Sequence, residues 1–228
     1  RKFSVLMSVY VKENPAFLEE AVESIIHQTL KPSEVVIVED GPLTPELYQV
    51  LEKLEAQSSI PIKRCPLEQN RGLGLALQYG VLQCQYDVIA RMDTDDIAVE
   101  DRFEQQFELM EKENLDLLGG HIAEFIDQPD EIVSYRRVPT KHEDIIAYQR
   151  MRSAFNHMTV MFKKEMVLKA GNYEDGLYME DDLLWLNMIS AGARTGNVDQ
   201  ILCKVRVGAG MFERRGGLRY LKLYRQAR

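Results

Sequence analysis

Short apolar runs alternate with amphipathic segments through the first half of the chain, and this alternation limits the fold more than any other feature. The apolar runs cover residues 3–10, 34–38, 60–65 and 87–92. Apolar residues at helical spacing follow each run, in residues 16–28, 45–54, 73–84 and 103–110. Strands that are buried on both faces and alternate with helices form right-handed βαβ units. The pattern therefore predicts an α/β fold with a doubly wound, mostly parallel sheet.

The second half of the chain has a mixed pattern. Strands are predicted at residues 117–125, 131–138, 155–162 and 200–207, and helices at residues 165–170 and 182–191. Gly171 and Gly192 follow the two helices, and glycine is typical of helix C-termini. The sequence contains no internal repeat or linker. We therefore expect one continuous domain over residues 1–213 with a mixed C-terminal half.

Polar residues close three of the strands predicted in the first half, at residues 8–10, 39–41 and 93–96. Ligands of doubly wound sheets bind beyond the carboxyl ends of the strands, so these residues should converge. Carboxylates that share a cleft repel one another unless a cation or hydrogen-bond donors compensate them. Because Mg²⁺ and Mn²⁺ prefer oxygen ligands, Asp93 and Asp95 predict a divalent-cation site. The alternative is that Asp95 or Asp96 caps the following helix.

Residues 70–74 read Asn-Arg-Gly-Leu-Gly and precede a predicted helix. One interpretation is a dinucleotide-binding fingerprint, because Asp93 lies 21 residues after Gly72, near the usual offset of a ribose-binding acid. However, the third glycine of that fingerprint would fall at Leu77, and the motif follows the third strand rather than the first. A loop in which glycine permits close backbone approach is the simpler interpretation.

Three consecutive acids, Glu180, Asp181 and Asp182, lie at the start of an amphipathic segment. Acids are favoured in the first turn of a helix by its dipole. A general base presented by the helix start explains the same residues equally well. His157 lies in an otherwise apolar run, where a lone histidine is more often structural than a ligand.

The charge distribution and the cysteines exclude several classes of protein. The net charge is −8, although residues 204–228 hold eight Lys or Arg and one Glu. The acidic remainder argues against nucleic-acid binding, which needs a basic face. Cys65, Cys84 and Cys203 form no CxxC pair, so we expect reduced thiols in a cytoplasmic protein. No apolar run reaches the roughly 18 residues that a membrane span needs.

Four motifs, in this order, resemble those of the family 2 glycosyltransferases, which have a GT-A-type fold. They are the opening strand at residues 4–10, the strand that ends in Glu39, Asp40 and Gly41, the glycine loop and acidic motif at residues 70–74 and 90–96, and Glu180 and Asp181 before Leu184 and Trp185. The resemblance covers roughly residues 3–207. It is closest to the bacterial enzymes that build exopolysaccharide, capsule or O-antigen units.

The resemblance implies that residues 1–98 form a nucleotide-binding half and residues 99–213 an acceptor-binding half. The expected nucleotide-binding residues are Ser8, Tyr10, Asp40, Arg71, Asp93 and Thr94. Asp40 would bind the uracil ring of a UDP-sugar, and Asp93 and Asp95 would hold Mn²⁺ or Mg²⁺ at its diphosphate. Asp181 would deprotonate the hydroxyl of a saccharide or lipid-linked saccharide acceptor, and the sugar would be transferred with inversion.

The sequence departs from the family pattern in two places. Many relatives have a histidine near position 207 that serves the metal or the diphosphate, whereas Gly208, Ala209 and Gly210 stand here. That role is either unfilled or falls to Arg206 or a residue of the tail. The Gln-x-x-Arg-Trp motif of processive synthases is also absent, which favours transfer of one sugar per encounter.

The tail and the competing functions leave alternatives open. Residues 214–228 form a basic amphipathic tail that either packs on the domain or docks on an anionic membrane, at the inner face of the plasma membrane. A sugar-phosphate nucleotidyltransferase would need a glycine-rich basic loop after the first strand, and residues 11–15 contain no glycine. A non-catalytic nucleotide-sugar-binding protein is disfavoured, because Asp40, Asp93, Asp95 and Asp181 are all present.

Overall fold

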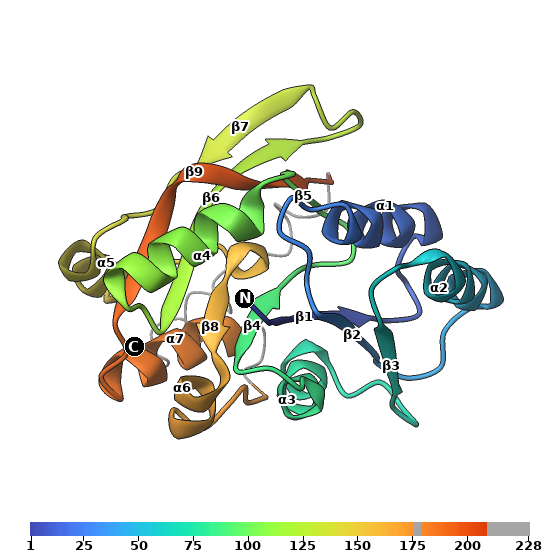
Figure 1. The fold of residues 1–228 in the computed structure, drawn as a ribbon, viewed down its shortest axis with the longest axis horizontal. Helices are drawn as coiled ribbons and strands as arrows, with labels where there is room; N and C mark the ends of the chain where they lie inside the picture. The colour runs from blue at the N-terminus through green and yellow to red at the C-terminus, as the bar shows by residue number, and fades with distance from the viewer. Residues whose placement is uncertain (176–178, 209–228) are drawn as a thin grey trace, which may run out of the picture.

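The computed structural model describes residues 1–175 and 179–208 (Figure 1). The strands are β1 (Ser4–Val9), β2 (Glu34–Glu39), β3 (Ile62–Pro66), β4 (Val88–Arg91), β5 (Ile97–Ala98), β6 (Leu117–Phe125), β7 (Ile132–Arg136), β8 (Met161–Lys163) and β9 (Thr195–Arg206). The helices are α1 (Pro15–Ile26), α2 (Pro45–Gln57), α3 (Leu73–Gln83), α4 (Arg102–Glu113), α5 (His142–Gln149), α6 (Lys164–Lys169) and α7 (Glu180–Ser190). A 3-10 turn, η1, covers His157–Thr159.

The strands of the described residues form one sheet, in the order β3-β2-β1-β4-β8-β6-β9-β5, with β7 paired to β6. β1 pairs in parallel with β2 and β4, and β2 pairs in parallel with β3. β8 pairs antiparallel with both β4 and β6, while β6 and β9 are parallel. The prediction of a doubly wound α/β fold with a mixed second half is therefore confirmed. The domain limits at residues 98 and 213 stay predictions, and the basic tail at residues 214–228 lies outside the described residues.

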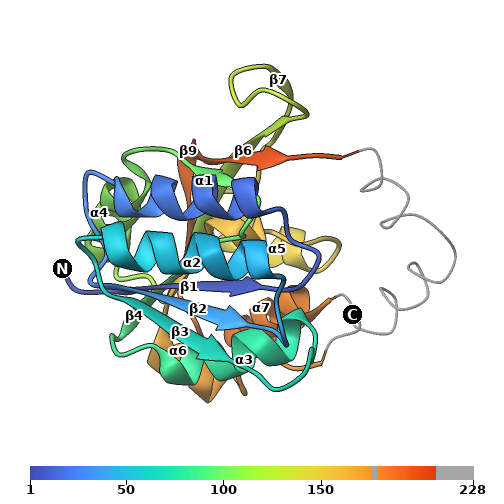
Figure 2. The ribbon, with the colours of Figure 1, turned by 90° about the vertical axis from the view of Figure 1, so that its right-hand side faces the viewer.

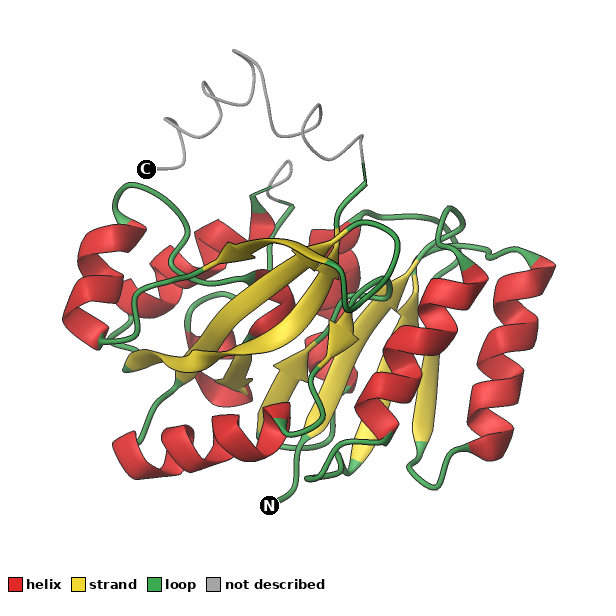
Figure 3. Cartoon of the chain, turned by 90° about the horizontal axis from the view of Figure 1, so that it is seen from above, coloured by secondary structure: helices red, strands yellow, loops and turns green. Residues whose placement is uncertain are grey.

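Side chains from the two faces of the sheet enter separate cores. Val5 and Met7 of β1 pack with apolar residues of α1, α2 and α4. Leu6 and Val36 face the other way and pack with residues of α3 and α7. Figure 2 shows α1 and α2 on one side of the sheet and α3 and α6 on the other, and Figure 3 shows the helices around the sheet from above. The continuous apolar runs thus reflect burial on both faces of the strands.

The prediction of one strand over residues 155–162 is wrong in its first part, which forms η1 before β8 begins. Asn156 Nδ2 donates to the Gly120 carbonyl at 2.8 Å, and Thr159 Oγ1 donates to the Asn156 carbonyl at 2.8 Å. Side-chain bonds of this kind to the backbone favour turns over strands. The apolar composition of the segment therefore reports its burial and not its conformation.

Three further elements, two in the second half and one at residues 97–98, differ from the sequence-based expectation. β9 begins at Thr195 rather than at residue 200. The prediction missed its first residues because Thr195 and Asn197 are polar although they are buried in the strand. α5 was not predicted, since it buries only Ile145 and Gln149. β5 consists of two residues and carries no periodic pattern.

No helix in residues 1–175 and 179–208 has the length and apolar character needed to span a bilayer. The three cysteines are buried, and none of them forms a disulfide. Burial raises the pKa of the Cys84 thiol and of the Cys203 thiol to about 12. All three therefore act as small core residues in this structure.

Gly41 follows β2 in the sequence and packs against the loop that precedes α3. Its φ is +85°, and a β-carbon at Gly41 would lie 2.6 Å from the backbone nitrogen of Asn70. Only glycine satisfies both conditions without strain. This contact fixes the position of Asp40 against residues 69–72.

We predict that Gly41→Ala lowers the free energy of unfolding more than Gly192→Ala does. Both glycines have positive φ, which costs an L-residue about 1–2 kcal/mol. A β-carbon at Gly192 meets nothing within 4 Å, whereas one at Gly41 meets backbone atoms and should cost about 1–3 kcal/mol more. Urea unfolding of the two variants measures the difference. Equal losses would show that the contact with Asn70 adds no constraint.

Candidate active site

Residues 93–96 follow β4 and place three carboxylates together. One ligand oxygen from each of Asp93, Asp95 and Asp96 lies within 4.8 Å of the others. β4 lies between β1 and β8, so the cluster sits where the parallel and mixed parts of the sheet meet. This is the edge at which ligands bind in doubly wound sheets.

The structure gives Asp96 a role other than helix capping. Its Oδ1 accepts the backbone N–H of Arg206 on β9 at 3.0 Å. The chain continues from Asp96 into β5, and α4 begins only at Arg102 without a side-chain cap. The capping alternative for Asp95 and Asp96 is therefore wrong. Asp96 is 2% exposed and ties β4 to β9, which leaves Asp93 and Asp95 as the more accessible acids.

The acids of this cluster carry a charge that the protein compensates only in part. Burial, together with the charges of Asp93 and Glu13, raises the pKa of Asp95 to about 7. Burial, followed by the charges of Asp93 and Asp95, raises the pKa of Asp96 well above its ordinary value. A hard divalent cation would relieve this repulsion, and an all-oxygen donor set fits Mg²⁺ or Mn²⁺.

A fourth acid, Glu13, belongs to the same group and was missed from the sequence. Thr94 is 4% exposed and donates from Oγ1 to Glu13 Oε2 at 2.5 Å. The same hydroxyl lies 3.4 Å from the Ser8 carbonyl, which links the end of β1 to the acidic motif. Glu13 lies 81 residues before Thr94, in a loop without a periodic pattern. The one sequence signal for it is that it is the acid within residues 11–15, directly after the first strand.

Asp40 holds the glycine loop with both of its oxygens. Oδ1 accepts the backbone N–H of Arg71 at 2.7 Å, and Oδ2 accepts that of Gly72 at 3.0 Å. Asn70 Nδ2 donates back to the Asp40 carbonyl at 3.1 Å. A carboxylate offers about four acceptor positions, so these bonds leave Asp40 capacity for a ligand N–H. Arg71 and Tyr10 are exposed beside this turn.

Gly74 explains the glycine pattern without a dinucleotide. A β-carbon at Gly74 would lie 2.4 Å from the Glu174 carbonyl oxygen and 3.0 Å from the Glu180 β-carbon. The start of α3 therefore packs directly against the start of α7. This contact brings the loop held by Asp40 close to the acids of residues 180–182, and it supports the simpler interpretation of the glycines.

The three acids at the start of α7 have different surroundings. Asp182 is 4% exposed, and its Oδ1 accepts a hydrogen bond from Gln149 Nε2 at 2.6 Å. Asp181 is half-buried, and burial together with the charge of Glu180 raises its pKa to about 7. A carboxyl group with a pKa near 7 is suited to general base catalysis. The helix dipole alone does not account for these differences.

A buried polar cluster lies behind the acids. Arg91, the last residue of β4, forms an ion pair with Asp93. Its side chain is 2% exposed. His157 Nε2 lies 3.0 Å from the Tyr173 hydroxyl, and the His157 ring lies 5.8 Å from that of Trp185. Burial and the Arg91 charge lower the pKa of His157 well below its ordinary value. This supports a structural role for His157, as expected for a lone histidine.

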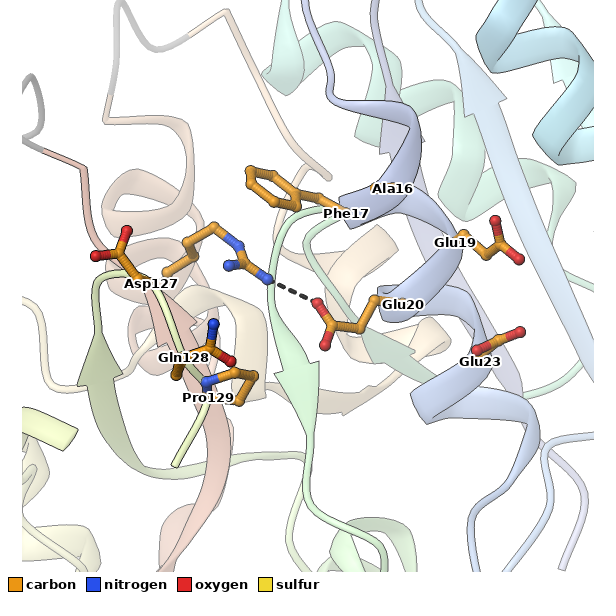
Figure 4. Close-up of a pocket in the computed structure, with 9 residues that line it drawn as sticks. Ala16, Phe17, Glu19, Glu20, Glu23, Asp127, Gln128 and Pro129 are labelled. Atoms are coloured by element: carbon orange, nitrogen blue, oxygen red, sulfur yellow. Dashed lines mark hydrogen bonds and ion pairs between the residues drawn. The ribbon is translucent and has the colours of Figure 1, made fainter. Parts of the chain in front are cut away.

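The Arg206 side chain does not lie at the acids, where the histidine expected near position 207 would serve the metal or the diphosphate. Its guanidinium forms an ion pair with Glu20 at 2.7 Å and lies 3.8 Å from the centre of the Phe17 ring. Arg206 lines a pocket of about 410 Å³ between α1 and residues 127–129. Figure 4 shows this pocket, with the ion pair to Glu20 drawn as a dashed line. None of the acids at positions 40, 93, 95 and 181 lines the pocket. Candidate residues beyond position 208 lie outside the described part of the chain.

Three relatives of known sequence are similar over almost the whole chain. An uncharacterized glycosyltransferase of Haemophilus influenzae is 47% identical over 97% of this chain and 82% of its own length. The amylovoran biosynthesis glycosyltransferase AmsE of Erwinia amylovora is 42% identical over 96% of this chain and 82% of its own length. The UDP-Gal:alpha-D-GlcNAc-diphosphoundecaprenol beta-1,3-galactosyltransferase of Escherichia coli is 38% identical over 96% of this chain and 79% of its own length.

Two solved structures share the fold at low sequence identity. S. aureus TarS 1–349 in complex with UDP-GlcNAc superposes with a TM-score of 0.73 and 18% identity, over 100% of this chain and 65% of that one. The Pyrobaculum calidifontis mannosyltransferase PcManGT, in complex with GDP-Man and Mn²⁺, superposes with a TM-score of 0.70 and 15% identity, over 93% of this chain and 59% of that one. The GT-A-type fold is thus confirmed.

Residues 4–172 match the profile of Glycosyl transferase family 2. Together with the similar relatives, this match shows that the chain is a glycosyltransferase of that family.

Proposed function

We propose that this glycosyltransferase moves a sugar from a UDP-sugar to a saccharide or lipid-linked saccharide during synthesis of a bacterial surface polysaccharide. The observation that carries the proposal is the cluster of Asp93, Asp95 and Asp96 at the end of β4. The loop that Asp40 holds leads into α3, and the start of α3 packs against the start of α7, which carries Asp181. The family membership sets aside the nucleotidyltransferase and the non-catalytic alternatives.

The names of the relatives support the donor and the pathway. AmsE is named for amylovoran biosynthesis, and the E. coli relative for transfer of galactose from UDP-Gal to a diphosphoundecaprenol-linked sugar. TarS was solved with UDP-GlcNAc. On this basis Asp40 reads the uracil ring, with Ser8, Tyr10, Arg71 and Thr94 around the nucleotide. Contact of the basic tail with an anionic membrane stays a prediction.

The cation-binding role belongs to Asp93 and Asp95. Both are partly exposed, whereas Asp96 is 2% exposed and accepts the Arg206 N–H. PcManGT was solved with Mn²⁺, which supports Mn²⁺ or Mg²⁺ at these acids. The cation would stabilise the departing nucleoside diphosphate as a Lewis acid. In the protein itself, Glu13 and Thr94 orient the acidic loop against the end of β1.

Asp181 acts as the general base. It accepts the proton of the acceptor hydroxyl as that oxygen forms its bond to the anomeric carbon and the bond to the diphosphate breaks. Attack from the face opposite the diphosphate inverts the anomeric centre. The start of α7 is held for this task by the contact of Gly74 with Glu180 and by the bond from Gln149 to Asp182.

We predict that Asp95→Asn removes cation-dependent binding of UDP. The variant loses one anionic ligand, so kcat/KM should fall about 100-fold or more. The increase in melting temperature that UDP and Mn²⁺ produce together should also disappear. Asp101→Asn is the matched control, because Asp101 is exposed and makes no capping bond. A wild-type response to UDP and Mn²⁺ in Asp95→Asn would refute the assignment.

We predict that Asp181→Asn lowers kcat about 10²–10⁴-fold, the usual contribution of a general base. Binding of UDP with Mn²⁺ should stay within about twofold of wild type, because Asp181 contacts the acceptor and not the nucleotide. Single-turnover kinetics and calorimetry separate the two effects. Unchanged transfer in Asp181→Asn would require a different base.

The pH profile gives a further prediction. Asp181 must be deprotonated to act, so kcat/KM at saturating Mn²⁺ should fall as the pH drops through about 7. The Glu180 charge is the second cause of the raised pKa, after burial. Glu180→Gln should therefore move this acidic limb to lower pH while activity at pH 8 is retained. A limb that stays in place would exclude Asp181 as the titrating group.

A further inference from the structure

The strand β7 lies at an edge of the sheet and pairs with β6 alone among the described residues. The pairing is antiparallel, with Tyr135 opposite Ala123 and Ser134 opposite Glu124. Figures 1 and 2 show the hairpin of β6 and β7 projecting beyond the body of the protein. An edge strand offers a row of unpaired backbone N–H and C=O groups to another chain.

β7 lacks the features by which edge strands avoid such pairing. β3, at one end of the strand order, follows Pro61, includes Pro66 and exposes Lys63. Proline and lysine are common protections of an edge strand. β7 has the sequence Ile-Val-Ser-Tyr-Arg and contains neither residue. Its free side is therefore open to the addition of a further strand.

The hairpin exposes apolar side chains along β7. Val133 is 55% exposed and Tyr135 is 61% exposed, and their spacing of two places both on the same face of the strand. Ile126, just after β6, is 54% exposed. Exposed apolar side chains that gather in this way mark an interaction site.

The two ends of β7 carry opposite charges that the rest of the described chain leaves unpaired. Glu131 precedes the strand and Arg137 follows it, and both are exposed. Arg136, next to Arg137, already forms an ion pair with Glu124. In the part of the chain that the structure describes, Glu131 and Arg137 form no ion pair. An acid at one end and a base at the other end make the strand complementary to an antiparallel copy of itself.

One register satisfies all of these side chains at once. Opposite side chains of antiparallel strands share a face, so a two-fold axis perpendicular to the sheet must pass through a residue. With the axis at Ser134, Tyr135 of each copy stands opposite Val133 of the other, and Arg137 stands opposite Glu131. Cross-strand pairs of an aromatic with a β-branched residue, and of opposite charges, stabilise a sheet.

The neighbouring registers do not offer these pairs. An axis at Val133 would place Tyr135 opposite Glu131, and an axis at Tyr135 would place Val133 opposite Arg137. Each of these alternatives sets an apolar side chain against a charge. The residue types along β7 thus favour the axis at Ser134.

We propose that β7 is a self-association surface, at which a second copy of this chain adds its own β7 antiparallel and joins the two sheets. The same strand is used on both sides, so the assembly closes as a dimer and does not grow into a filament. Strand addition over five residues is a small contact, so the dimer forms reversibly and only at micromolar or higher concentrations. The inference does not depend on the proposed function, because none of the residues given a role in transfer lies on β7.

Sedimentation velocity of the 228-residue chain, at micromolar to submillimolar concentrations, measures the association. Wild type should pass from monomer to dimer as the concentration rises. Arg137→Glu sets two acids against each other twice in the dimer, and Glu131→Arg does the same with two bases. Each variant should weaken the association about tenfold or more.

A mixture of the two variants tests the register of the charges. In equal amounts, Arg137→Glu and Glu131→Arg restore both opposite-charge pairs in a mixed dimer, which should form as readily as the wild-type dimer. Arg150→Glu is the matched control, because Arg150 is an exposed arginine at the end of α5 and should leave association unchanged.

A cysteine at the predicted axis gives an independent test. Opposite Cα atoms of antiparallel strands lie about 4.5–5.5 Å apart, which is within the range that a disulfide spans. Oxidised Ser134→Cys should therefore run as a cross-linked dimer on a non-reducing gel. Ser59→Cys, an exposed serine before β3, should run as a monomer. The three native cysteines are buried, so they do not compete.

The outcomes either support or overturn the proposal. It is overturned if wild type sediments as a monomer at every concentration, whichever other segment or protein then covers β7. It is also overturned if a wild-type dimer persists unchanged in Arg137→Glu and Glu131→Arg, since that dimer would use another surface. Weakening in both variants, with recovery in their mixture and a cross-link at Ser134→Cys, supports it.

Discussion

The repulsion among the carboxylates at the end of β4 is the constraint on which the rest of the site depends. Asp93, Asp95 and Asp96 present ligand oxygens within 4.8 Å of one another, and Glu13 adds a fourth charge. Among the described residues, this charge is offset by the ion pair of Arg91 with Asp93, by the Arg206 N–H that donates to Asp96, and by the Thr94 hydroxyl and the Asn14 N–H that donate to Glu13. Burial, followed by the repulsion that remains, raises the pKa values of Asp95 and Asp96. A cation or protons at the site would relieve this repulsion.

The sheet order explains why the charge accumulates at this place. β4 pairs with β1 on one side and with β8 on the other, so its end is the seam between a parallel and an antiparallel region. The loops after β1 and β2 approach from the parallel side, and α7 approaches through its contact with α3. Glycine at positions 41 and 74 permits both approaches, because any β-carbon there would collide with backbone.

Much of the first half could be predicted from the sequence, because its strands and helices carry strong local patterns. The places of Asp40, Asp93 and Asp95 just after strands could be predicted from the sequence, whereas the choice of Asp181 as the base came from the family resemblance; the roles of these residues stay predictions. Glu13 and Gln149 were out of reach, since their partners Thr94 and Asp182 lie 81 and 33 residues away and loop geometry decides the contacts. In the second half, buried polar residues such as Asn197 broke the apolar pattern that strand prediction uses.

The end of β9 is the place where the family resemblance leads one to expect a histidine that this chain lacks. The Arg206 side chain turns toward Glu20 and the Phe17 ring, away from the acids, while its backbone N–H holds Asp96. β9 thus serves the site through a backbone donor, which any residue could supply. Because Asp96 is 2% exposed and holds that bond, Asp93 and Asp95 are the partly exposed acids to which we assign the cation in the proposed function. Since Asp93 also pairs with Arg91, a cation held by Asp93 would share that carboxylate with a buried guanidinium.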